Sequence, residues 1–103
     1  MKQYDWNSKL DFGKYNGQTV ENVYANDPRY IYWCFQKIEW FSITDTVFES
    51  LSVVKEYKEA ISNYMCFQEK EYKDIIDNLE KYYDHLMKVH LSKNVHDNDS
   101  ENN

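Results

Sequence analysis

The stretch Leu10–Trp33, LDFGKYNGQTVENVYANDPRYIYW, decides the fold of this chain because it contains the signals for a turn and for two helix starts. The pair Asn16-Gly17 is typical of a two-residue hairpin turn of type I′, in which both central residues need positive φ. Before the turn, residues 4–12 alternate between apolar and polar side chains, which predicts a strand with one buried face. A short return strand over residues 18–20 completes the predicted β-hairpin.

Two short helices are predicted after the turn. Thr19 is a favourable N-cap for a helix over residues 20–25, and Asp27 is the predicted N-cap of the next helix, with Pro28 at its first position. In that second helix, apolar side chains recur at the i, i+3, i+4 and i+7 spacing of a buried helix face. The stripe consists of Ile31, Cys34, Phe35 and Ile38, with Tyr30 and Trp33 beside it.

A heptad pattern dominates the C-terminal half of the chain. Capping-box signals predict a helix start near residues 43–46, and alternating steps of four and three residues from Val47 to Val89 meet mostly apolar side chains. One continuous helix fits this pattern, and so does an antiparallel helical hairpin that breaks near Ser62 or near residues 68–70. The expected fold class is therefore α+β and mostly α: a two-stranded β-hairpin plus two short helices, then a long heptad-patterned helix or helical hairpin.

These patterns divide the chain into three segments. Residues 1–57 form an N-terminal module, residues 58–91 a helical extension continuous with the helix that starts near residue 44, and residues 92–103 a polar tail expected to be disordered. The heptad pattern forms a long apolar seam along the helix, and this seam needs a partner surface, supplied by the N-terminal module or by another chain. We expect a homo-oligomer. The expected oligomer interface consists of Ile61, Met65, Tyr72, Ile75, Leu79, Tyr82, Leu86 and Val89.

Composition restricts the function classes that fit this chain. A net charge of −6 argues against a protein that holds nucleic acid mainly by neutralising phosphates. The acidity belongs to the C-terminal half, however, since residues 1–41 carry five basic and five acidic side chains. The sequence shows no signal peptide and no apolar run long enough to cross a membrane, so we expect a soluble, cytoplasmic protein with no membrane partner.

No catalytic or metal-binding pattern is recognisable in the sequence. Cys34 and Cys66 do not form a CxxC pair, and His85 and His90 are five residues apart, which places them on different faces of a helix. The glycine spacing fits neither a P-loop nor a dinucleotide-binding motif. We therefore expect a protein that is not an enzyme, uses no cofactor and binds no metal.

One known family resembles the N-terminal module. The matching positions are Phe12-Gly13-Lys14-Tyr15, Gly17, Thr19-Val20, Asp27-Pro28, Tyr30 and Trp33. In their order and spacing they resemble the small C-terminal domain of exodeoxyribonuclease X-like proteins, and the resemblance extends over residues 8–57. The nuclease domain of such proteins has no counterpart in these residues, so the resemblance implies an accessory module of the nucleic-acid-processing machinery rather than exonuclease activity.

A small cationic and aromatic surface is the candidate binding site. Lys14, Tyr15, Arg29 and Lys9 combine positive charge with an aromatic ring, which suits stacking on unpaired bases. The sequence thus favours a non-catalytic binding or adaptor module associated with nucleic-acid processing, with weak single-strand binding and a nucleic-acid-processing protein as a further candidate partner. The alternative is a structural protein that acts by homo-oligomerisation through its C-terminal helix.

The same aromatic residues also fit a purely structural role. Tyr15, Tyr30 and Trp33 have spacings typical of side chains packed in a core. Gly13 leaves room for a close neighbour, which is either the side chain of Trp33 or a ligand.

Overall fold

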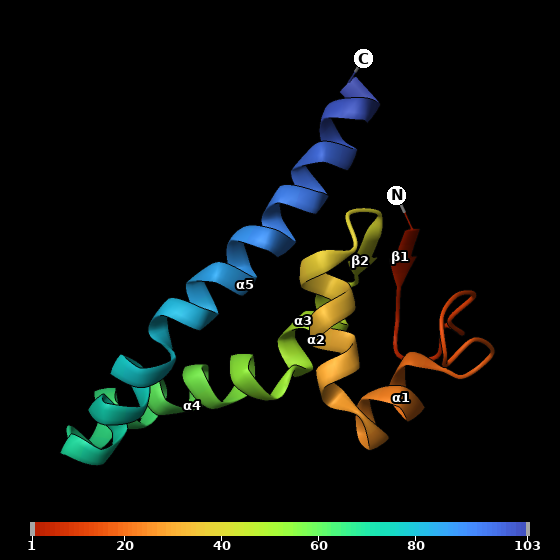
Figure 1. Cartoon of the computed structure of the whole chain (residues 1–103). Helices are drawn as coiled ribbons and strands as arrows, with labels where there is room; N and C mark the ends of the chain where they lie inside the picture. Colours follow the sequence, from red (N-terminus) through yellow and green to blue (C-terminus); the bar gives the residue numbers. More distant parts are fainter. Residues whose placement is uncertain (1, 103) are drawn as a thin grey trace.

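A computed structural model describes the backbone of residues 2–102 and the side chains of residues 2–94. In chain order, the elements are β1 (Lys2–Tyr4), α1 (Val20–Asn26), α2 (Pro28–Lys37), β2 (Phe41–Ile43), α3 (Asp45–Ser50), α4 (Ser52–Phe67) and α5 (Lys70–Asn102). Figure 1 shows that α4 leads away from the short elements to a tip, and that α5 returns from this tip toward α2 and β2. The fold class is α+β and mostly α, as the sequence predicts.

Two helices begin directly after a threonine N-cap, and Thr19 is the one that the sequence predicts as a cap. The Thr19 hydroxyl accepts a hydrogen bond from the backbone N–H of Asn22 (3.1 Å), and α1 begins directly after it. The Thr44 hydroxyl accepts from the backbone N–H of Val47 (3.3 Å) at the start of α3, inside the range predicted for that helix. Such bonds satisfy N–H groups that have no partner within the first turn of a helix.

The sheet differs from the predicted β-hairpin. Strand β1 pairs in parallel with β2, with residue 2 opposite residue 41 and residue 4 opposite residue 43. Within residues 2–102, the predicted antiparallel pairing is represented by an isolated bridge between Lys9 and Thr19. The predicted long strand is wrong because the chain turns after Tyr4, where the Ser8 N–H donates to the Asp5 carbonyl oxygen (3.1 Å).

The turn at Asn16-Gly17 forms with a different geometry. The Gln18 N–H donates to the Tyr15 carbonyl oxygen (3.0 Å). Gly17 has a φ of +92°, as predicted, but Asn16 does not have positive φ. Positive φ at the third turn position alone is the pattern of a type II turn, so the prediction of type I′ is wrong.

The core lies where the sheet, α2, α3 and residues 86–93 of α5 meet. Its largest fully buried side chains include Leu10, Ile31, Phe35, Phe41, Phe48, Leu51 and Leu86. The Tyr4 ring stacks on Phe41 with 4.6 Å between the ring centroids, which joins the two strands on the core side. Large aromatic side chains of this kind give a small domain enough buried apolar surface to fold.

Helices α4 and α5 form a helical hairpin, which is the second of the two arrangements that fit the heptad pattern. Helix α4 ends at Phe67, and its C-cap residue Gln68 has a left-handed φ of 53° that reverses the chain. The rings of Tyr57 and Tyr83 stack across the hairpin with 4.4 Å between their centroids. The chain also breaks at Leu51, so the helix that starts near residue 44 ends at Ser50 and is not continuous with the helical extension as predicted.

Helix α5 continues beyond the predicted boundary at residue 92. The buried Lys93 ammonium donates to the carbonyl oxygens of Phe35 (2.6 Å), Ile38 (3.2 Å) and Phe41. Phe35 and Ile38 lie at the end of α2, where carbonyl groups lack intrahelical partners and favour a positive charge. Residues 92–94 are therefore part of the packed helix, whereas residues 95–103 of the predicted tail lie outside the residues whose side chains are described.

Candidate functional site

Lys14 lies among aromatic rings where the loop before α1 meets the start of α2. Its ammonium nitrogen is 5.1 Å from the ring centroid of Tyr15 and 5.6 Å from that of Tyr30, both within the range of cation–π contacts. The two rings meet edge to face, with 4.8 Å between their centroids. We call Lys14, Tyr15, Asp27, Tyr30 and Trp33 the aromatic cluster.

Asp27 connects the parts of this cluster. Its carboxylate accepts a hydrogen bond from the Tyr15 hydroxyl (2.7 Å) and lies 3.9 Å from the Lys14 ammonium. This hydrogen bond to Asp27 is the main reason that the pKa of Tyr15 is raised. Helix α2 begins at Pro28 with Asp27 as its N-cap residue, as predicted, but the Asp27 side chain makes no capping hydrogen bond and binds the Tyr15 hydroxyl instead.

Gly13 allows the backbone to approach Tyr30. It has a φ of +70°, and a Cβ atom added at this position would come closer than 3.0 Å to the Tyr30 hydroxyl oxygen. The space predicted beside Gly13 is therefore filled by Tyr30 rather than by Trp33 or a ligand. The glycine allows the loop to close over the start of α2, which fixes the position of Lys14 and Tyr15.

Trp33 is the exposed member of the aromatic cluster. Its side chain is 52% exposed, and its ring lies 6.1 Å from that of Tyr30 at an angle of 32°. The sequence predicts that Trp33 lies beside the apolar stripe of α2, either as a core residue or as the neighbour of Gly13. Its position outside the i, i+3, i+4, i+7 stripe is the signal that could have marked it as a surface residue.

The structure brings together two of the four predicted binding residues, Lys14 and Tyr15. Arg29 is exposed in the first turn of α2, next to Tyr30 in the chain. Lys9 is exposed and lies opposite Thr19 in the isolated bridge. The hydrogen bonds and ion pairs found for residues 2–94 do not join the side chain of Arg29 or Lys9 to the cluster.

The predicted oligomer interface is partly covered within one chain. Leu86 is fully buried in the core, whereas Met65 and Tyr82 are 75% and 37% exposed. Tyr82 contacts α2, because its hydroxyl accepts a hydrogen bond from the Gln36 side chain (3.2 Å). The half-buried members of the predicted interface are Ile61, Tyr72, Ile75, Leu79 and Val89.

The segment that carries the aromatic cluster matches a known family. Residues 10–39 match the family model described as Exodeoxyribonuclease X-like C-terminal. The match confirms the resemblance over the turn, α1 and α2, although it covers a shorter segment than residues 8–57. No curated protein and no solved structure matches the chain. The segment is thus similar to an accessory domain of nucleic-acid-processing proteins.

None of the helices in the described part of the chain is long and apolar enough to cross a membrane.

Proposed function

We propose that this chain is a non-catalytic accessory module of nucleic-acid-processing proteins, and that its aromatic cluster binds single-stranded nucleic acid weakly. The exposed indole of Trp33 carries this proposal, because it lies on the segment that matches the family and beside the Lys14–Tyr30 contact. An exposed tryptophan next to cationic side chains is a platform on which an unpaired base stacks. The side chains proposed to contact the strand are Trp33, Tyr30, Lys14 and Arg29.

The charges around the cluster favour single strands over duplexes. Asp27 partly neutralises Lys14, and the whole chain has a net charge of −6, so the protein makes few phosphate contacts. Base stacking does not depend on many such contacts, but it requires bases that are free of a duplex. Binding is therefore weak, prefers single strands and has a shallow dependence on salt concentration.

Fluorescence anisotropy with short labelled DNA and RNA strands at low salt tests this proposal. Trp33→Ala is expected to weaken binding by about 1–3 kcal/mol, which is the contribution of one stacked base. Arg29→Ala is expected to weaken binding and to reduce its salt dependence, because this change removes a counterion-releasing contact. The matched control is Phe67→Ala, which removes another exposed aromatic ring (62% exposed) at the end of α4.

Two results would contradict the proposal. One is the absence of binding to any single strand at low salt. The other is an equal effect of Trp33→Ala and Phe67→Ala, since it would mean that any exposed ring of this chain contacts the oligonucleotide nonspecifically.

Homo-oligomerisation through the C-terminal helix is a separate proposal. It is supported by the exposure of Met65 and Tyr82, which belong to the predicted interface and leave apolar surface uncovered. Sedimentation velocity at high micromolar concentration tests it directly. A dimer that Met65→Glu dissociates supports the proposal, and a monomer contradicts it.

A further inference from the structure

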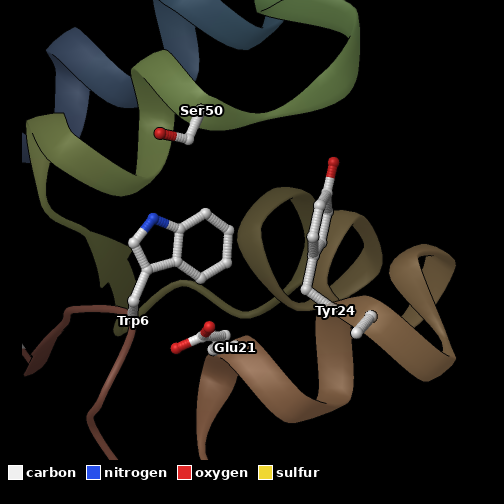
Figure 2. A pocket seen from close by; sticks show the side chains of 5 residues that line it. Trp6, Glu21, Tyr24 and Ser50 are labelled. Atoms are coloured by element: carbon white, nitrogen blue, oxygen red, sulfur yellow. The ribbon is translucent and has the colours of Figure 1, made fainter.

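A shallow pocket lies beside α1, on residues that do not belong to the aromatic cluster. Its volume is about 340 Å³, within the usual range of ligand sites, and it is lined by Trp6, Glu21, Tyr24, Ala25 and Ser50. Figure 2 shows the rings of Trp6 and Tyr24 facing the same space, with Glu21 below them and Ser50 above. The ring centroids are 5.3 Å apart and the ring planes are tilted by 54°, so the rings form an angled wall rather than a closed stack.

Backbone hydrogen bonds from several elements hold this wall in place. The Trp6 N–H donates to the Asp5 carboxylate (2.8 Å), and the Trp6 carbonyl oxygen accepts from the N–H of Glu21 (2.9 Å). The Tyr24 hydroxyl accepts from the N–H of Ser52 (2.8 Å), the first residue of α4. Since hydrogen bonds within the chain already position the two rings, little conformational freedom is lost when a ligand binds.

The charge of the pocket favours a cation. Glu21 is exposed, and its carboxylate makes no hydrogen bond or ion pair with the side chains of residues 2–94. The faces of Trp6 and Tyr24 carry the negative part of the aromatic quadrupole, and none of the five lining residues is basic. A phosphate would be repelled by this combination, so the pocket is not a second site for a nucleic-acid strand.

We propose that this pocket binds an arginine side chain of a partner protein. A guanidinium group is planar, stacks on aromatic faces and pairs with a carboxylate through two parallel hydrogen bonds, which fits the wall formed by Trp6 and Tyr24 and the carboxylate of Glu21. A methylated ammonium group is the alternative cationic ligand, and it needs a cage with aromatic rings on several sides. The two angled rings of this pocket leave it open and therefore favour arginine. The one arginine of the chain, Arg29, belongs to the surface proposed to bind nucleic acid, so the proposed occupant is a different protein, and a second copy is an outcome that the experiment distinguishes.

Nuclear magnetic resonance of the full chain tests this proposal through the indole N–H signal of Trp6, which a Trp6→Phe variant assigns. The probe is a blocked Gly-Arg-Gly peptide, and the matched peptides contain citrulline, which has nearly the same shape without the charge, or lysine. We expect the arginine peptide to shift the Trp6 signal with a Kd on the order of millimolar. The lysine peptide is expected to bind more weakly, and the citrulline peptide is expected to leave the signal unchanged.

Variants of exposed glutamates separate the pocket from general charge effects. Glu21→Gln is expected to weaken binding of the arginine peptide by up to about fivefold, the upper end of the range for an exposed ion pair. Glu56→Gln removes the same charge from an exposed position on α4 and is expected to leave the Kd unchanged. Neither variant removes a residue of the aromatic cluster, so oligonucleotide binding remains an independent measurement.

Three results would overturn the proposal. An equal response to arginine and citrulline would show that the pocket has no preference for a cation. Equal weakening by Glu21→Gln and Glu56→Gln would assign the binding to the net charge of the chain. A Trp6 signal that changes with protein concentration and loses this dependence in Arg29→Gln would identify a second copy as the occupant.

Discussion

Gly13→Ala tests whether the glycine of the motif Phe12-Gly13-Lys14-Tyr15 is needed for the backbone to lie against the Tyr30 hydroxyl. Gly13 has a φ of +70°, where alanine costs about 1–2 kcal/mol more than glycine. The added Cβ atom would also lie closer than 3.0 Å to the Tyr30 hydroxyl oxygen. The Tyr30 ring packs between Tyr15 and Trp33, so its displacement adds about 1–3 kcal/mol for overpacking. Together these costs predict a loss of about 2–5 kcal/mol in the free energy of unfolding.

Gly17→Ala is the matched control for this prediction. Gly17 also has positive φ (+92°), but no atom lies within 4 Å of a Cβ added there, so only the backbone cost of about 1–2 kcal/mol applies. Urea unfolding measures both variants, and a double-mutant cycle with Tyr30→Phe, which removes the hydroxyl oxygen, isolates the steric part. Equal costs for the two alanine variants, or no coupling between Gly13→Ala and Tyr30→Phe, would refute the reasoning.

Three further predictions concern the packing of α5 and the half-buried side chain of Tyr32. Leu86→Ala is expected to cost about 2–5 kcal/mol in urea unfolding because Leu86 is fully buried, and Leu79→Ala is expected to cost less because Leu79 is half-buried. Lys93→Met removes the donor that the Phe35 carbonyl oxygen binds, whereas the Ile38 carbonyl oxygen keeps the Phe41 N–H, and thermal unfolding is expected to show a loss of about 1–3 kcal/mol. Burial raises the pKa of Tyr32 from 10.0 to about 12, so its contribution to stability is complete below pH 10 and is lost as the pH rises through 12. Circular dichroism and tyrosinate absorbance, recorded together during an alkaline titration, measure this loss, which Tyr32→Phe is expected to reduce.

The features that the sequence predicted correctly are those with local signals. Thr19 caps α1, Pro28 begins α2, and Gly17 has positive φ because each depends on a few neighbouring residues. The stripe of α2 predicted its buried face, since Ile31, Cys34 and Phe35 are all buried. The family resemblance is also a local signal, because the matching positions lie in one short, continuous segment.

The candidate site could be predicted only in part. Lys14 and Tyr15 are neighbours in the chain, and the sequence placed them on one surface. It predicted Asp27 at the N-cap of α2, but not that the Asp27 carboxylate binds the Tyr15 hydroxyl rather than a backbone N–H of the helix. This choice depends on how the loop closes over the helix start, and the exposure of Trp33 depends on which side of α2 the rest of the chain covers.

By itself, the sequence determined the helical character of the chain, the turn, the two short helices and the segment that resembles the family. Only the tertiary structure decided that β1 pairs in parallel with β2, that α4 and α5 fold into a hairpin, and that Lys93 caps α2. Each of these features joins residues that are far apart in the chain or selects between two arrangements with the same local pattern. The heptad pattern fits both a continuous helix and a hairpin. The chain reverses at Gln68, which has a left-handed φ, without the glycine that usually marks such a position. The hairpin brings Leu86 into the same buried cluster as Phe35 and Phe41, and burial of this kind, which joins residues far apart in the chain, cannot be read from a local pattern.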